Sequence, residues 1–144
     1  MLHSIRLAAE LAAPAADIYA MYLDAKIHAA ITGAPVKIGA REGAAFSAFG
    51  GALSGRLLRL VPGKMIVQTW RSNIFKPGDA DSILVLTMLP QGRKTTLLDL
   101  QHINVPEQDY AGVSQGWEIY YFAPWREYLA KRHGKRSPKR AEMR

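Results

Sequence analysis

Apolar and polar positions alternate at the start of the chain. Leu7, Ala9 and Leu11 are separated by small or charged residues, and this period of two is typical of a strand with one buried face. We therefore predict a first strand over residues 2–11.

Two short helices are expected to follow this strand. Pro14 suits the first position of a helix, because its missing N–H would be unpaired there in any case. The buried stripe of this helix would comprise Ile18, Met21, Tyr22 and Ala25. Asp24 can cap a second helix over residues 25–32, which Gly33 would end.

The middle of the chain is a run of short apolar segments separated by turn signals. The Pro-Gly pair at 62–63 and the Pro-Gln-Gly run at 90–92 both mark tight turns. The expected strands cover residues 36–38, 44–49, 53–61, 65–71, 82–89 and 94–105. This spacing is typical of an antiparallel meander, which Pro106 would end.

The last element is predicted to be a long helix with an aromatic face. Its stripe recurs every four residues and comprises Val113, Trp117, Tyr121, Trp125 and Leu129, widened by Tyr120 and Tyr128. Pro124 would leave the carbonyl of Tyr120 without its usual partner and bend the helix. Gly116 would let the helix approach the sheet closely beside Trp117. Trp117 is then the expected anchor, and Trp125, beyond the bend, the residue better placed to touch a ligand.

The order of elements decides the fold class. One strand, two short helices, about six strands and a long helix contain no βαβ alternation, which excludes a doubly wound parallel sheet. We predict an α+β fold in which a curved antiparallel sheet of about six or seven strands wraps round the long C-terminal helix. The wedge between sheet and helix is either filled by large side chains or left as a cavity.

Composition narrows the chemistry and the compartment. The 144 residues fit one domain, and they include no cysteine, which excludes disulfides, thiolate metal sites and a cysteine nucleophile. Apolar runs are far shorter than the roughly 18 residues that span a bilayer, and charged residues interrupt the N-terminal apolar stretch. We expect a cytoplasmic protein.

The positive charge is concentrated at the C-terminus. Residues 1–130 hold 12 Lys and Arg against 11 Asp and Glu, whereas residues 131–144 hold 7 against one. We predict a domain over residues 1–132 and a basic, disordered tail over 133–144. The tail is either an electrostatic arm for an anionic partner or a solvated end. The solvated end is favoured, and nucleic-acid or membrane contact is not expected, because no aromatic residues are interleaved with the charges.

Histidine is the main candidate for chemistry. None of the four histidines has metal-ligand spacing, so we predict no metal and no cofactor. His102 shares its strand parity with Leu98 and Leu100 and should face the helix. It is either a hydrogen-bond donor or general base in a cavity, or a partly buried side chain bonded to backbone at the strand end, which we favour. Arg71 and Asn104 lie at strand ends and could add polar groups at the cavity mouth, although Arg71 could equally be a surface residue.

An ordered set of motifs resembles the C-terminal domain of the heat-shock chaperone ATPase activators. These are the glycine-rich stretch at 46–55, the Trp-Arg pair at 70–71 and the Gly-Trp pair at 116–117. The similarity covers roughly residues 5–130. It implies the helix-grip (START-like) fold. Eukaryotic members of that family carry a second, N-terminal domain that supplies much of the chaperone contact, and we expect this domain to be missing here.

The resemblance leaves three functions open. Standalone domains of the START-like superfamily commonly bind apolar small molecules, and a few are cyclases or hydrolases. The first hypothesis is a non-catalytic module that binds a small apolar ligand or a protein segment under the last helix. The second is a cyclase- or hydrolase-type enzyme that uses His102 with a tyrosine. The third is a regulator of a heat-shock chaperone ATPase that acts through its surface.

The candidate ligand-binding residues are Trp70, His102, Trp117, Tyr120, Tyr121 and Trp125. A cavity above roughly 300 Å³ would favour a binder over a surface regulator. A cavity that enclosed His102 would favour an enzyme. The sequence leaves the ligand and the oligomeric state open.

Overall fold

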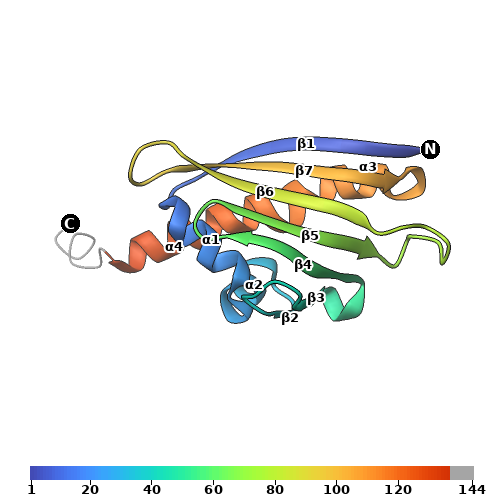
Figure 1. The fold of residues 1–144 in the computed structure, drawn as a ribbon. Helices are drawn as coiled ribbons and strands as arrows, with labels where there is room; N and C mark the ends of the chain where they lie inside the picture. The colour runs from blue at the N-terminus through green and yellow to red at the C-terminus, as the bar shows by residue number, and fades with distance from the viewer. Residues whose placement is uncertain (137–144) are drawn as a thin grey trace.

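One antiparallel sheet and a long C-terminal helix make up most of the computed structural model, which describes residues 1–136 (Figure 1). The strands are β1 (Leu2–Leu11), β2 (Val36–Ile38), β3 (Ala45–Ala48), β4 (Leu53–Val61), β5 (Met65–Ser72), β6 (Ser82–Pro90) and β7 (Thr96–Pro106). They form a 7-stranded sheet in the order β1-β7-β6-β5-β4-β3-β2. The α+β helix-grip prediction is confirmed.

Alternating side chains give this sheet one buried face. On β5 the buried residues are Ile66, Gln68, Trp70 and Ser72, and the residues between them are more exposed. Trp70 therefore points towards the helix rather than to solvent. The close approach of β4 to β5 requires Gly55, because a Cβ there would lie 1.9 Å from the Thr69 carbonyl oxygen.

Helices α1 (Ala15–Leu23) and α2 (Ala25–Thr32) follow β1, as predicted. Pro14 is the N-cap of α1 rather than its first helical residue, since its ψ of 152° is extended. The carboxylate of Asp24 caps α2 by accepting hydrogen bonds from the backbone N–H groups of Lys26 and Ile27. Gly33 ends α2 with a φ of 79°, a left-handed conformation that glycine adopts without strain.

The C-terminal helix contains a wider turn in its middle. Its parts are α3 (Glu107–Gly116), the π-helical segment η2 (Trp117–Phe122) and α4 (Ala123–Arg136). In a regular α-helix each four-residue step overshoots a full turn by about 40°, so a strict four-residue stripe would wind off the core. The π turn takes up this drift, and all five residues of the predicted stripe are buried.

The proline and the glycine of this helix have different surroundings. Pro124 follows the π segment, where the N–H of Ala123 bonds to the carbonyl of Glu118, five residues back, and the bend expected at Pro124 stays a prediction. We expected Gly116 to let the helix approach the sheet. A Cβ at Gly116 would meet only the ring of Tyr120 on the same helix, 3.6 Å away, so the sheet does not require a glycine there.

The C-terminal end of α4 overlaps the start of the predicted tail. The helix runs to Arg136, so the first four residues of the segment 133–144 are helical. The ring of His133 donates a hydrogen bond from Nε2 to the carbonyl of Ala12, at 2.7 Å. The rest of the predicted tail, residues 137–144, lies outside the described residues. Within residues 1–136, no helix is long and apolar enough to cross a membrane.

Candidate functional site

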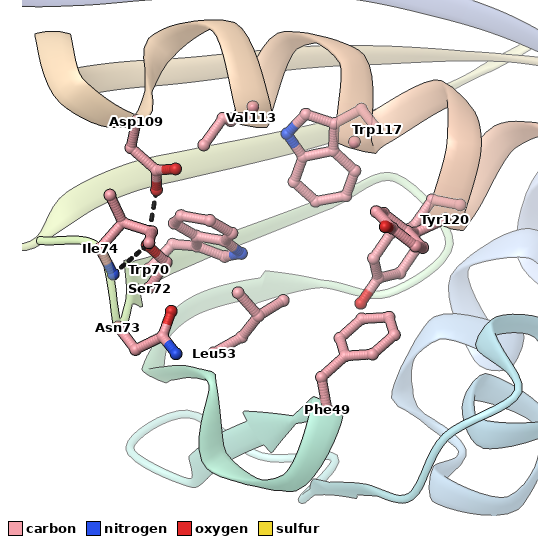
Figure 2. A pocket seen from close by; sticks show the side chains of 13 residues that line it. Phe49, Leu53, Trp70, Ser72, Asn73, Ile74, Asp109, Val113, Trp117 and Tyr120 are labelled. Atoms are coloured by element: carbon pink, nitrogen blue, oxygen red, sulfur yellow. Dashed lines mark hydrogen bonds between the residues drawn. The ribbon is translucent and has the colours of Figure 1, made fainter.

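A cavity of about 440 Å³ lies between the sheet and the C-terminal helix (Figure 2). It opens beneath α3 and the π segment, and it is bounded on the other side by η1 (Phe49–Gly51) and by the ends of β4 and β5. The residues that line it are Phe49, Leu53, Trp70, Ser72, Asn73, Ile74, Asp109, Gly112, Val113, Gly116, Trp117, Tyr120 and Tyr121.

Aromatic rings form most of the cavity wall. Trp70 and Trp117 are buried, with ring centroids 6.5 Å apart. At the rim, Phe49 and Tyr120 meet edge to face with centroids 5.6 Å apart, a favourable aromatic geometry. Tyr120 is 54% exposed, so part of its ring remains free to contact a ligand.

His102 lies behind this wall and not in it. The indole Nε1–H of Trp117 donates to His102 Nδ1 at 3.2 Å. Nε2 must then carry the proton, and it donates to the Ser82 hydroxyl at 2.8 Å, which in turn donates to the carbonyl of Trp70 at 2.6 Å. Burial lowers the pKa of His102 to about 3. His102 is therefore neutral, and it has no free lone pair with which to act as a base.

This geometry refines the prediction for His102. The side chain faces the helix, as its strand parity predicted, and it is completely buried. We favoured a partly buried histidine bonded to backbone, but its ring bonds to two side chains instead. The sequence could not specify these partners, because Ser82 and Trp117 come from separate elements.

A second buried histidine, His28, supports the cavity from the side of α2. Its Nδ1–H donates to the carbonyl of Tyr22, and its Nε2 accepts the hydroxyl proton of Tyr121, both at 2.8 Å. Burial lowers the pKa of His28 to about 4 and raises that of Tyr121. The sequence indicated only that His28 lacks metal-ligand spacing. Its place three residues before the apolar Ile31 on a short helix was the signal for burial.

The polar edge of the cavity is formed by Asp109 and Ser72. Asp109 lies in the first turn of α3 and is 8% exposed. The Ser72 hydroxyl donates to Asp109 Oδ2 at 2.5 Å, and the backbone N–H of Ile74 donates to Ser72 Oγ at 3.0 Å. Burial raises the pKa of Asp109, and the bond from Ser72 opposes this rise. Sequence reasoning missed the pair because it forms only where β5 meets α3.

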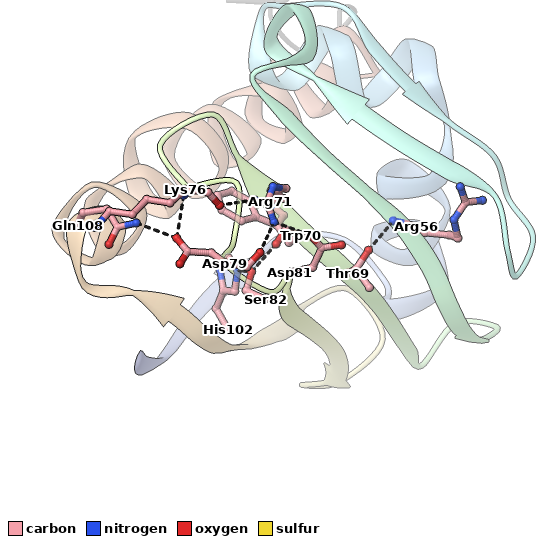
Figure 3. A network of polar contacts seen from close by, with 10 residues as sticks. All are labelled: Arg56, Thr69, Trp70, Arg71, Lys76, Asp79, Asp81, Ser82, His102 and Gln108. Carbon is pink, nitrogen blue, oxygen red and sulfur yellow. Dashed lines mark hydrogen bonds and ion pairs between the residues drawn. The ribbon is translucent and has the colours of Figure 1, made fainter. Parts of the chain in front are cut away.

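The loop after β5 holds the cavity rim in place (Figure 3). Arg71 donates to the carbonyls of Lys76 and Asp79, at 2.6 and 2.7 Å, and pairs with the carboxylate of Asp81 at 3.0 Å. Gln108 of α3 donates to Asp79 Oδ2 at 3.0 Å. Of the two positions that the sequence left open for Arg71, the cavity mouth is not the one observed: Arg71 is not among the lining residues, and it orders the loop that carries the rim residues Asn73 and Ile74.

Asn104, the other polar candidate for the cavity mouth, is also not among the lining residues. It is exposed on β7, and its φ is 65°.

Four of the six predicted ligand-binding residues line the cavity, namely Trp70, Trp117, Tyr120 and Tyr121. His102 and Trp125 do not. Trp125, which we expected to be better placed than Trp117 to touch a ligand, is 2% exposed and packs in the core. No group of three or more His, Cys, Asp or Glu side chains that could hold a metal ion occurs in the described part of the chain.

Comparison with known proteins gives consistent matches. Residues 12–130 match the family model described as activator of Hsp90 ATPase homolog 1-like protein. The activator of 90 kDa heat shock protein ATPase homolog of Dictyostelium discoideum is 26% identical over 115 residues, covering 80% of this chain and 30% of that protein. The human homolog 1 is 29% identical over 106 residues, covering 74% and 31%.

The chain thus spans about a third of the length of these curated relatives. Among solved structures, an HSP90 activator from Plasmodium falciparum superposes with a TM-score of 0.81 at 20% identity, covering 88% of this chain and 96% of that one. At this identity the likeness bears on the fold alone.

Proposed function

Because the chain belongs to the family of activator of Hsp90 ATPase homolog 1-like proteins, we propose that it is a non-catalytic binding module. Its ligand is a small apolar molecule held between the sheet and the C-terminal helix. The observation that carries this proposal is the aromatic-lined cavity of about 440 Å³. That volume falls within the range of roughly 300–1,000 Å³ that is usual for small-molecule sites. A cytosolic location, expected from the sequence, belongs to the same proposal.

Catalysis through His102 is not part of this proposal. No histidine is among the described residues that line the cavity, and the acceptor nitrogen of His102 already accepts a hydrogen bond from the indole N–H of Trp117. A general base needs a free lone pair within reach of the substrate proton. The arrangement around His102 supports the wall of the cavity instead.

The binding of a small molecule can be tested by filling the cavity. Leu53 lines the cavity at the start of β4, whereas Leu58 on the same strand is 46% exposed and outside the lining. We expect Leu53→Trp to weaken the binding of the neutral probe Nile red at least tenfold, and Leu58→Trp to leave it unchanged. Equal binding by both variants would contradict the proposal. Independently of these variants, native mass spectrometry of protein purified from its own host would show whether a small molecule is co-purified.

A second candidate function follows from the names of the relatives. The human and Dictyostelium proteins are named as activators of the 90 kDa heat shock protein ATPase, so a heat-shock chaperone is the candidate partner. The test is the steady-state ATPase rate of the chaperone from the same organism with and without this chain. Leu53→Trp separates the two functions, because stimulation through the surface should survive this change. An unchanged ATPase rate would argue against the second candidate and leave the first intact.

A further inference from the structure

The described lining of the cavity carries one acidic side chain and no basic one. Of the described residues that line it, Asp109 alone has an ionisable carboxyl or basic side chain; none of them is Lys, Arg or His. Asp109 is 8% exposed, and it forms no ion pair with any described residue. Burying a carboxylate without a cation costs free energy. Its position in the first turn of α3 offsets part of that cost through the helix dipole. A cationic ligand that pairs with the carboxylate would offset the rest.

The two oxygens of Asp109 have different surroundings. Oδ2 accepts the hydroxyl proton of Ser72, whereas the other oxygen is turned towards the cavity (Figure 2). The neighbouring wall residue is Gly112, and a Cβ placed there would lie 3.4 Å from Oδ1. The absence of a side chain at Gly112 therefore leaves space beside the oxygen that Ser72 does not use.

The rest of the wall suits a cation with an apolar body. Phe49, Trp70, Trp117 and Tyr120 line the same cavity with aromatic rings, and Phe49 and Tyr120 lie at the end away from Asp109 (Figure 2). The faces of such rings carry partial negative charge and attract organic cations, most strongly where water is excluded. A carboxylate and several rings around one cavity together provide a charge partner and an apolar lining for the same molecule.

We propose that the cavity selects a hydrophobic amine, with its ammonium group paired to Asp109 and its apolar body among the rings. This inference rests on the proposed function, since it names the ligand class of the same cavity. A hydrophobic carboxylate is disfavoured, because it would be buried near a like charge with no basic side chain in the lining to accept it. A hydrophobic alcohol can donate one hydrogen bond to Asp109 but neutralises no charge, so it should bind with intermediate affinity.

The test uses three ligands that share one apolar body, namely phenylbutylamine, phenylbutanol and phenylbutyrate. Their affinities for the full chain are measured by titration calorimetry, with displacement of Nile red as a second readout. We expect the amine to bind about tenfold more tightly than the alcohol, and the acid to bind at least tenfold more weakly than the alcohol. Comparable affinities for all three would overturn the choice of an amine and leave the proposed function standing. No binding by any of them, together with no binding of Nile red, would overturn both.

Two variants assign the preference to the charge on Asp109. Asp109→Asn keeps the size of the side chain and its ability to accept from Ser72, but it removes the charge. The amine should lose about tenfold in affinity, while the alcohol changes little. Ser72→Ala is the matched control: it removes the hydrogen bond to Asp109 and keeps the charge, so the preference for the amine should persist. If Asp109→Asn does not fold, the ligand series on the unaltered protein still decides whether the cavity selects an amine. Retention of the full preference in Asp109→Asn would overturn the assignment.

Discussion

The two halves of the C-terminal helix present the same aromatic stripe to different surroundings. Under α4 the wedge is solid: α2 contacts α4 and α1 packs on β6 (Figure 1). Trp125 and Leu129 are there 2% and 1% exposed. Under α3 and the start of the π segment a cavity remains, and among the described helices α2 reaches only its edge, where His28 bonds to Tyr121. The difference shows that an aromatic stripe specifies which helix face is buried, whereas the elements opposite it decide whether a cavity is left.

The largest expected loss of stability comes from truncating a side chain in the solid half of the helix. Trp125→Ala should lower the free energy of unfolding by about 3–5 kcal/mol, because the indole is almost fully buried and its neighbours cannot collapse into the space. Tyr120→Ala, on the same helix at the half-exposed cavity rim, should cost no more than about 1 kcal/mol. Urea unfolding of both variants measures the difference. Equal losses would mean that the two halves are packed alike.

Acid should destabilise the middle of the helix, because both buried histidines bond to side chains of the π segment, Trp117 and Tyr121. The pKa values of His28 and His102 are lowered in the folded state to about 4 and about 3, from 6.5. The unfolded chain therefore binds more protons below pH 6.5, and stability falls as the pH falls. Each histidine should therefore lower the free energy of unfolding by roughly 2 kcal/mol between pH 6.5 and about pH 5.

Chemical denaturation at a series of pH values measures this slope. His102→Gln should reduce the slope, because it removes one of the two groups whose pKa is lowered by burial. Asp109 acts in the opposite sense, because its pKa is raised, so the slope is best compared between variants. A stability that stayed constant from pH 6.5 to about pH 5 would contradict the neutral, buried state of both rings.

A matched pair of tryptophan variants sharpens the view of the cavity wall. Trp117→Phe removes the indole N–H that His102 accepts, whereas Nε1 of Trp70 has no hydrogen-bond partner among the described residues. Both changes remove a similar volume. Trp117→Phe should therefore cost about 1–2 kcal/mol more than Trp70→Phe, because it leaves a buried acceptor unpaired. Thermal or urea unfolding gives the difference, and a larger loss for Trp70→Phe would contradict the assigned hydrogen bond.

The smallest effect should be a gain in stability. Gly116 has helical backbone angles, and a Cβ there meets only the ring of Tyr120 at an ordinary contact distance. Gly116→Ala should stabilise the protein by about 0.5–1 kcal/mol, since it reduces the freedom of the unfolded chain. Gly55→Ala is the opposing control, because its Cβ would overlap the carbonyl of Thr69. Destabilisation by Gly116→Ala would contradict the conclusion that the packing requires no glycine at this position.

The fold was more accessible from the sequence than the site. Strand periods, turn residues and caps such as Asp24 act locally, so each could be interpreted within a few residues, and their order gave the architecture. The parity of His102 correctly predicted the direction of its side chain. Its bonds to Ser82 and Trp117 depend on contacts between distant elements, and such contacts leave no local pattern.

The same reason explains why Trp125, rather than Trp117, was expected to be better placed to touch a ligand. Trp117 and Trp125 occupy equivalent positions in a four-residue repeat, so the sequence cannot say which of them adjoins a cavity. That depends on how far α1 and α2 extend along the helix, because they pack closely under α4 and, in the described part of the chain, reach the cavity only at Tyr121. Asp109 gave no signal beyond an acidic residue in a first helical turn, because its partner Ser72 lies 37 residues away in the sequence.

The π turn has a consequence for how sequences of this family should be aligned. It accommodates one residue more than a regular α-helix would place in the same turn, so Trp117–Phe122 acts as a local insertion. A relative whose last helix is regular would need a one-residue gap here to keep both ends of its aromatic stripe in register. Without that gap, one half of the helix would be matched about 100° out of phase. Residues over the cavity would then be compared with residues that face solvent.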